Sequence, residues 1–175
     1  MRTRWLGFVA IVSFWLAFDQ GTKAWARTLP VDPAGCAFSG LAEHRCAGVP
    51  QPVIDGVWDW ELAANTGAAF SSLRGSRWIL SALALAAIAA LGVMAWKTAP
   101  EQRLKRFALA AIVGGAAGNL IDRVRDGAVT DFVRWRIGDH RWPIFNVADV
   151  ALVIGVALLL LETVATSRRA GKVAA

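Results

Sequence analysis

The chain has 175 residues, of which 56% are hydrophobic, and its mean hydropathy of +0.45 is high for a globular domain. This composition excludes an ordinary water-soluble core and favours one compact domain built from membrane helices. The net charge of +6 and the pI near 10.3 are accounted for by the topology derived below, so we expect no nucleic-acid partner.

Four apolar segments divide the chain. They run from Trp5 to Phe18, Trp78 to Trp96, Phe107 to Ile121 and Val150 to Leu161. Only the second is long enough, without any charge, to cross a bilayer outright; the others need polar residues at their ends. We predict a membrane all-α fold with four transmembrane helices and a small periplasmic surface element that contains β-structure. Residues 1–175 form a single integral membrane domain, with helices near 4–26, 77–97, 104–124 and 146–166 and outer loops over 27–76 and 125–145.

The N-terminal segment resembles a signal peptide, because MRTR precedes an apolar run. No small-residue cleavage site follows before DQGTK, so we expect the segment to be retained as the first helix. Asp19 and Lys23 then lie four residues apart at its outer end. They are placed to pair on one face, or they simply mark where the helix ends.

Both cysteines, Cys36 and Cys46, lie in the first outer loop. In an oxidising periplasm, two cysteines that enclose a short loop favour a disulfide; two free thiols in a flexible insertion are the alternative. A zinc site is not expected, since His44 is the only histidine nearby and there is no CxxC spacing. We expect no metal and no other cofactor.

The end of this loop predicts surface β-structure followed by a turn. Apolar and polar residues alternate from Val57 to Leu62, which is typical of a short strand or two on the membrane surface. Trp58 and Trp60 suit an interfacial belt there. The following NTGAAF, 65–70, is consistent with an ordinary turn when taken alone, since Asn and Gly are turn residues.

The third apolar segment contains GGAAGNLIDR, residues 114–123. Gly114 and Gly118 stand four apart, a spacing that lets membrane helices approach closely. Asn119, Asp122 and Arg123 are separated by three and four residues, so they can share a helix face. An anchored ion pair between Asp122 and Arg123 at the membrane rim is the simpler interpretation.

Asp131 and Asp149 are two acids in apolar surroundings, in VTDFV and FNVAD. We expect Asp131 in the loop between the third and fourth helices and Asp149 at the start of the fourth. Asn146 can act as the N-cap of that helix, with Asp149 completing a capping box. A carboxylate near hydrocarbon is rare without a function, and two of them close in space can share one proton, as in aspartic proteases.

The basic residues predict the orientation. With both termini in the cytoplasm, the inner segments carry nine basic and two acidic residues, a net charge of +7. The first outer segment, 19–77, has five basic and six acidic residues, and the second, 122–149, has five of each. Cytoplasmic termini therefore satisfy the positive-inside rule.

Five motifs, in this order and on this layout, resemble the lipoprotein signal peptidases (signal peptidase II), a family of bacterial intramembrane aspartic proteases. They are FDQGTK, NTGAAFS, GGAAGNLIDRV, VTDF and FNVADV, and the resemblance runs from about Phe18 to Gly155. The chain departs from the family between Pro30 and about Pro52, where the loop is longer and contains the cysteine pair. This departure bears on the shape of the outer loop.

The resemblance implies both a site and a reaction. The acids of the VxDF and FNxAD segments, which form the catalytic dyad of the family, correspond to Asp131 and Asp149. Supporting or substrate-binding roles transfer to Asp19, Lys23, Asn65, Gly67, Asn119, Asp122, Arg123, Asn146 and Ala148. The implied substrate is a prolipoprotein whose lipobox cysteine already bears diacylglycerol, and the cut falls on the amino side of that cysteine.

The resemblance also implies a location. We expect a multi-pass protein of the bacterial inner membrane, with both termini cytoplasmic and the active site at the periplasmic side. Its partners would be the diacylglyceryl-prolipoprotein substrates and the lipid bilayer, and we expect a monomer.

Two other classes of protein remain open at this point. A small transporter or channel would also place acids inside a bundle, but in the middle of helices rather than at a helix start or in a loop. A non-catalytic membrane scaffold would explain the glycines and tryptophans, but not the clustered Asn, Asp and Arg side chains.

Overall fold

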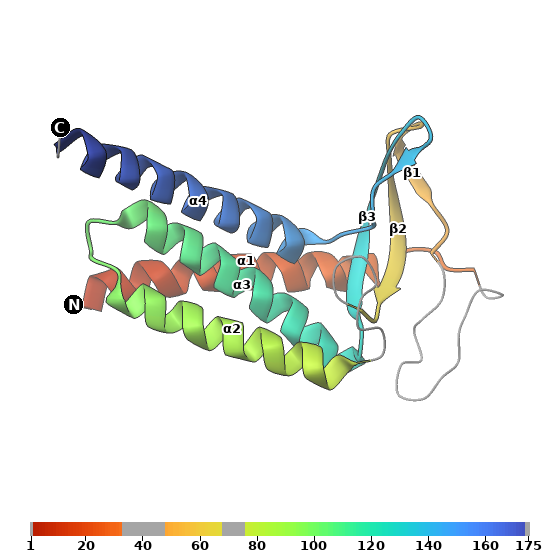
Figure 1. Ribbon diagram of the computed structural model, residues 1–175. Coiled ribbons are helices and arrows are strands. Elements are labelled where there is room, and N and C mark those ends of the chain that lie inside the picture. The colour runs from red at the N-terminus through yellow and green to blue at the C-terminus, as the bar shows by residue number, and fades with distance from the viewer. Residues whose placement is uncertain (1, 33–47, 68–75, 174–175) are drawn as a thin grey trace.

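A helical bundle carries a small sheet at one end in the computed structural model, which describes residues 2–32, 48–67 and 76–173 (Figure 1). The elements are α1 (Arg2–Ala26), β1 (Gln51–Ile54), β2 (Trp58–Asn65), α2 (Arg77–Lys97), α3 (Arg103–Asp126), β3 (Val129–Ile137), β4 (His140–Arg141) and α4 (Val147–Val173). The start of α1, the end of α4 and the α2–α3 connection all lie at the end of the bundle opposite to the sheet (Figure 1). The helix α4 continues to Val173, beyond the end near 166 that the sequence predicted.

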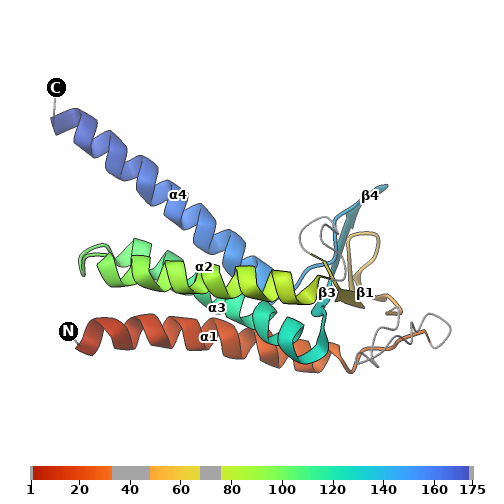
Figure 2. The ribbon, with the colours of Figure 1, turned by 60° about the horizontal axis from the view of Figure 1, so that its bottom comes forward.

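Three helices in the described part of the chain, α2, α3 and α4, are long and apolar enough to cross a membrane. The bare apolar runs had singled out α2 alone, but α3 and α4 also qualify because a spanning helix tolerates a few polar residues near its ends. The helix α1 does not meet the same criterion, although it packs along α3 as a member of the bundle. Figure 2 shows α4 diverging from the other three helices with distance from the sheet.

The helix α2 has a tryptophan near each end. Trp78 and Trp96 are 66% and 65% exposed, and their separation of 18 positions corresponds to about 27 Å of helix, close to the thickness of the hydrocarbon core. Exposed tryptophans at this separation are typical of the two interfacial belts of a membrane helix. The helix ends at Lys97 with Thr98 as its C-cap, and Pro100, which cannot continue a helix, follows two residues after the cap.

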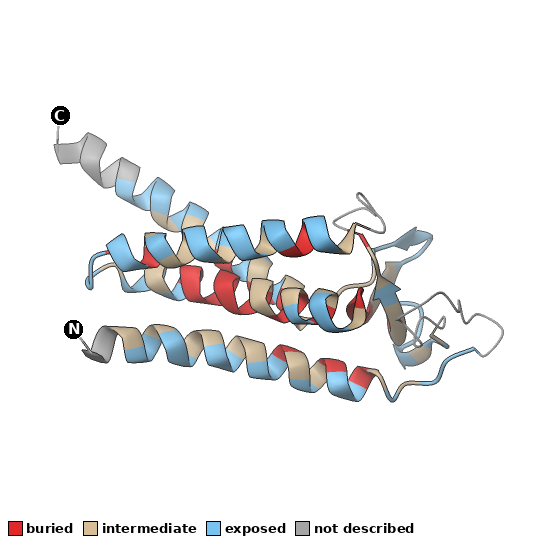
Figure 3. Ribbon diagram, turned by 90° about the horizontal axis from the view of Figure 1, so that it is seen from below, coloured by how far each residue is buried: buried red, intermediate tan, exposed pale blue. Residues whose placement is uncertain are grey.

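The helix α3 is the centre of the bundle and is the most buried helix (Figure 3). Glycines allow its neighbours to come close. A Cβ on Gly114 would lie 2.8 Å from Cβ of Trp15 in α1, and a Cβ on Gly155 of α4 would lie 2.8 Å from the carbonyl oxygen of Ala108 in α3. The close approach expected at Gly114 is therefore present, and it lets α1 contact α3 through backbone as well as side chains.

The sheet is antiparallel in the order β1-β2-β3-β4. The alternating segment that predicted a surface strand is β2. Asp131 was expected in a loop, and this was wrong: it lies in β3, opposite Ala63 of β2, while Asn65 lies opposite Val129. The sequence VTDFVRWRI of β3 is rich in β-branched and aromatic residues, which favours a strand once β2 is beside it.

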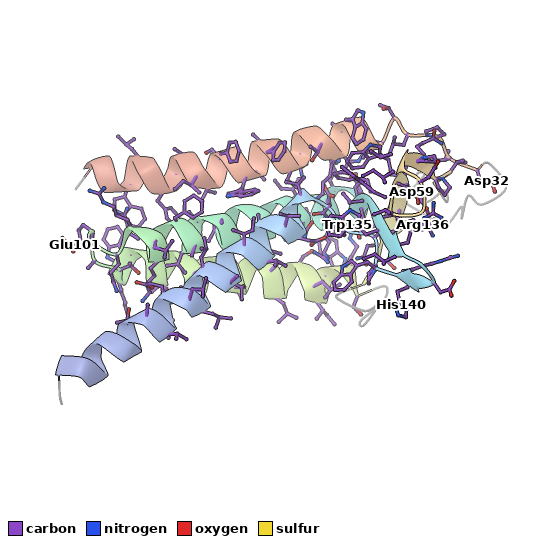
Figure 4. The ribbon with its side chains drawn as sticks, turned by 90° about the horizontal axis from the view of Figure 1, so that it is seen from above. Asp32, Asp59, Glu101, Trp135, Arg136 and His140 are labelled. Carbon is purple, nitrogen blue, oxygen red and sulfur yellow. The ribbon has the colours of Figure 1, made fainter. Side chains whose placement is uncertain are left out.

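A small aromatic core joins the sheet to the outer end of α1. Phe132 is buried and lies 5.9 Å from the ring of Trp60, which in turn lies 5.1 Å from Trp25 of α1. In the same sheet, acidic side chains of β2 pair with arginines of β3, including Asp59 with Arg136 at 3.1 Å (Figure 4). The aromatic contacts and ion pairs fix β3 relative to the ends of the helices.

Candidate active site

A tight turn at the end of α3 brings β3 back beside that helix. Gly127 has φ of 72°, a left-handed conformation that glycine adopts readily, and its N–H donates to the carbonyl oxygen of Arg123 at 3.1 Å. The Thr130 N–H then donates to Oδ2 of Asp122 at 3.0 Å. As a result Asp131, the next residue, lies near the C-terminal end of α3.

A second backbone contact places Asn146 beside the same strand. The N–H groups of Phe132 and Val133 donate to the carbonyl oxygen of Phe145, at 3.0 and 2.9 Å. Asn146 follows at once and caps α4, because its Oδ1 accepts from the Asp149 N–H at 3.1 Å and its own N–H donates to Oδ2 of Asp149 at 3.1 Å. This is the reciprocal capping box that the sequence suggested, and it also fixes the Asp149 carboxylate.

Three asparagine side chains hold the two acids in one cluster. Asn146 Nδ2 donates to Oδ1 of Asp131 at 2.6 Å, and Asn65 Nδ2 donates to Oδ2 of Asp131 at 3.0 Å. Asn119 Nδ2 donates to Oδ1 of Asp149 at 3.0 Å. Asn146 therefore contacts both carboxylates, one through its side chain and the other through its backbone.

Asp131 lies in a setting that favours its protonated form. The residue is 3% exposed, and this burial, together with the negative charge of Asp149, raises its pKa to about 7. The hydrogen bonds from Asn65 and Asn146 act in the opposite direction, because they stabilise the carboxylate. Asp131 can consequently exchange a proton with water near neutral pH.

A fully buried lysine lies behind the acids. Lys23 Nζ is 2.9 Å from Oδ2 of Asp19, 3.2 Å from Oδ2 of Asp122 and 2.9 Å from Oδ1 of Asn119. The side chains of Lys23, Asp19 and Asp122 are all fully buried from solvent. Arg27 supplies further positive charge, at 3.2 Å from Oδ1 of Asp122, so the two carboxylates of this cluster, Asp19 and Asp122, each have a cation partner.

Asp19 links α1 to the start of α4. Its Oδ1 accepts from the N–H of Ala148 at 3.0 Å, and a carboxylate is favourable at this positive end of a helix. Gly118 makes room for it, because a Cβ at that position would overlap the Asp19 carboxylate. The glycine thus serves the polar cluster as well as helix packing.

Arg123 faces the two acids from α3. Its Nη2 donates to the Gly67 carbonyl oxygen at 3.1 Å, and the Gly67 N–H donates to Oδ1 of Asn65 at 3.0 Å. The charge of Arg123 acts on both Asp131 and Asp149, while its Nε is buried without a hydrogen-bond partner in the described part of the chain. The simple ion pair with Asp122 was a wrong expectation, since Asp122 pairs with Lys23 and Arg27.

Sequence reasoning missed three polar residues of this cluster. Gln20 Nε2 donates to Asp19 at 3.1 Å and to Asp122 at 3.2 Å, and Arg27 also donates to Oγ1 of Thr130 at 2.9 Å. One signal was present, because residues 19, 23 and 27 are four apart and form one polar face at the end of α1.

The structure brings the predicted site residues that it describes into one connected hydrogen-bond network. Cys36 and Cys46 lie outside the described residues. The network consists of Asp19, Lys23, Asn65, Gly67, Asn119, Asp122, Arg123, Asp131, Asn146, Ala148 and Asp149. They come from α1, β2, α3, β3 and α4, so the site forms only when these elements meet.

The family model described as signal peptidase (SPase) II matches residues 11–165 of the chain. The chain belongs to the signal peptidase II family. Among its relatives, the lipoprotein signal peptidase of Xanthomonas campestris pv. campestris (strain 8004) is 39% identical over 95% of this chain and 93% of its own. That of Xylella fastidiosa (strain 9a5c) is 42% identical over 83% of each chain.

Solved structures agree with this assignment. A bacterial membrane enzyme determined by the in meso method at 2.3 Å resolution superposes with a TM-score of 0.77, at 29% identity, over 92% of this chain and 89% of that one. Another, at 1.9 Å resolution, gives a TM-score of 0.73 at 30% identity. This signal peptidase II is thus a membrane peptidase of lipoprotein processing, built on the fold of those enzymes.

Proposed function

We propose that this signal peptidase II is an intramembrane aspartic endopeptidase in which Asp131 and Asp149 are the catalytic pair. The observation that carries the proposal is the position of Asn146, which contacts Oδ1 of Asp131 at 2.6 Å and Oδ2 of Asp149 at 3.1 Å. Two carboxylates held by one residue, with a pKa of about 7 at Asp131, are suited to sharing a proton at neutral pH.

The reaction assigns a different task to each acid. Asp149, the more exposed of the two, acts as the general base and takes a proton from a water molecule, whose oxygen adds to the scissile carbonyl carbon. Asp131 is protonated and donates a hydrogen bond to the carbonyl oxygen. When the tetrahedral intermediate breaks down, the carbonyl re-forms, the C–N bond cleaves and the leaving nitrogen takes up the proton that Asp149 removed from water. The products are the carboxylate of the signal peptide and a free amino group on the mature protein.

The substrate is a prolipoprotein with a diacylglyceryl-modified cysteine, and the bond cut lies on the amino side of that cysteine. Such a substrate cannot leave the bilayer, so its scissile bond must be reached at the membrane edge. Arg123, whose positive charge acts on both acids, is placed to hold the substrate backbone beside them. Asn119 and Asn146 orient the acids, and the Lys23 cluster holds Asn119.

The proposed site also implies a membrane topology. The four helices span the inner membrane with both termini in the cytoplasm, and the sheet lies at the periplasmic surface. This places the acids, which lie where the helices meet the sheet, at the periplasmic edge of the bilayer. The excess of basic residues at the opposite end supports the orientation. The enzyme acts as a monomer.

Purified enzyme in detergent micelles, incubated with a synthetic prolipoprotein, tests the proposal directly. The diacylglyceryl-modified substrate should release its signal peptide, with the new amino terminus on the modified cysteine when the product is examined by mass spectrometry. An otherwise identical peptide with an unmodified cysteine is the matched control and should be cut far more slowly. Cleavage at another bond, or equal cleavage of both peptides, would contradict the assigned specificity.

A further inference from the structure

A cavity of about 280 Å³ lies between α2 and α3, at the end of the bundle opposite to the sheet. Figure 4 places Glu101, in the α2–α3 connection, at that end, far from Asp59 and Arg136 of the sheet. The cavity therefore has no part in the site described above. Its walls are of two kinds, one apolar and the other polar with two lysines.

The two lysines give the rim of the cavity a positive charge. Lys97 is the last residue of α2 and is exposed, and Lys105 is in the first turns of α3 and is half-buried. Neither forms an ion pair with a carboxylate among the residues that the structure describes. Residues 97–106 contain four basic side chains against the single acid Glu101. The rim is thus complementary to an anion.

The apolar wall extends from the rim toward the middle of the bundle. It is formed by Ala90, Val93 and Met94 of α2, and Val93 is 55% exposed. Ala90 precedes Lys97 by seven residues, which corresponds to about 10 Å along the helix. A molecule that follows this wall from the lysines therefore needs a long apolar part as well as a negative group.

Two tryptophans place the rim at the membrane surface. Trp96 is 65% exposed and stacks on Trp5 of α1, with ring centroids 5.2 Å apart. Tryptophans of this kind lie at the level of the lipid headgroups. The adjacent Lys97 is therefore at headgroup depth, and the apolar wall is at the depth of the acyl chains.

We propose that this cavity binds one anionic phospholipid of the cytoplasmic leaflet. Its phosphate lies between Lys97 and Lys105, and one acyl chain runs along Ala90 and Val93. Basic pockets between transmembrane helices on the cytoplasmic side are typical sites for anionic headgroups. A free phosphate ion would leave the apolar wall uncovered, and a zwitterionic lipid would leave the two positive charges without net compensation.

Native mass spectrometry of the full-length protein in detergent tests this site, with dioleoyl phosphatidylglycerol, dioleoyl phosphatidylcholine and inorganic phosphate titrated separately. Phosphatidylglycerol should bind more tightly than phosphatidylcholine. Lys97→Gln and Lys105→Gln should each weaken that binding about fivefold. Arg103→Gln is the matched control, because it removes the same charge two residues from Lys105 without lining the cavity, and it should have little effect.

A second variant separates a lipid from free phosphate. Ala90→Trp fills the apolar wall without changing the charge, so it should weaken phosphatidylglycerol binding, and thermal unfolding without added lipid will show whether it folds. If it does not fold, the comparison of Lys105→Gln with Arg103→Gln decides. Equal affinity for phosphatidylglycerol and phosphatidylcholine would overturn the proposal, as would equal effects of Lys105→Gln and Arg103→Gln. Inorganic phosphate that binds the protein as tightly as phosphatidylglycerol would also overturn it. A folded Ala90→Trp variant with unchanged affinity also overturns it.

Discussion

Lys23 Nζ donates to Oδ1 of Asn119 at 2.9 Å, and this contact decides which way the Asn119 amide faces. With its oxygen toward the lysine, the amide nitrogen points to Asp149, where it donates at 3.0 Å. A buried ion cluster at the sheet end of the bundle therefore orients one of the two proposed catalytic acids through a single amide.

Replacing that amide by a carboxylate tests its role. Asn119→Asp keeps an acceptor for Lys23 but loses the donor to Asp149. It also adds a third carboxylate to the two, Asp19 and Asp122, that already contact Lys23. We expect kcat to fall about a hundredfold, the scale that follows when a reacting group is poorly positioned. The melting temperature in detergent should change little, since Lys23 keeps its partner. A large loss of thermal stability with normal kcat would assign Asn119 a purely structural role.

The pKa of about 7 at Asp131 predicts a pH dependence. Activity should decline as pH rises through about 7, because the pair then loses its shared proton. Asn65→Ala removes a donor that stabilises the ionised form, so it should raise the pKa of Asp131 and move this decline to higher pH. Profiles of kcat/KM against pH would measure both effects, and a decline that moves to lower pH in the variant would contradict this assignment.

The same raised pKa affects folding. An unfolded Asp ionises near pH 4, before the buried Asp131 does, so its contribution to the stability of the native state is lost as pH rises from about 4 to about 7. The melting temperature should therefore fall more steeply with pH over this range for the wild type than for Asp131→Asn. Parallel plots of melting temperature against pH would show that the pKa of Asp131 is not raised.

Apolar runs in the sequence mark α2, α3 and α4, which are long and apolar enough to cross a membrane, but the sequence did not predict β3. The strand VTDFVRWRI is buried on both faces over its first half, so it lacks the alternation that revealed β2. Its partner in the sheet is also more than sixty residues earlier in the chain. Only this distant pairing shows that Asp131 belongs to a strand.

The pairing of charges was harder to predict than their presence. Asp122 and Arg123 are neighbours in sequence, which suggested an ion pair, but adjacent residues on a helix point in different directions. Arg123 accordingly reaches Gly67, and Asp122 reaches Lys23 and Arg27 of α1. Which charges meet depends on how α1 packs on α3, and no local pattern contains that information.

The cysteine pair in the first outer loop remains a prediction from the sequence. If Cys36 and Cys46 are bridged, a thiol reagent should label neither in the denatured, unreduced protein, and both after reduction. The bridge would stabilise the loop by about 2 to 3 kcal/mol. Cys36→Ser with Cys46→Ser should retain activity, since neither thiol has a role in the proposed chemistry. Ready labelling without reductant would reject the bridge.

Reporter fusions test the proposed orientation. Fusions near Pro50 and Gly138 should report the periplasm, and fusions near Gln102 and Gly171 the cytoplasm, because the basic residues gather at the second pair of positions. A cytoplasmic signal at Pro50 would move Asp19 and Lys23 to the wrong side of the membrane. The placement of the acids at the periplasmic edge would then have to be given up.

The proposed mechanism depends on both acids. Asp131→Asn and Asp149→Asn nearly preserve volume but prevent proton sharing, so each should leave a folded enzyme that binds substrate and turns it over about a thousandfold more slowly. The double variant should be hardly slower than either single one, because the two acids act as a unit. Asp139→Asn is the matched control, because Asp139 is exposed and lies outside the network, and this variant should keep a near-normal rate. Asp126 is a less suitable control because it pairs with Arg27. Turnover above about a tenth of wild type in either single variant would remove that acid from the catalytic pair, and Asp122 would be the next candidate.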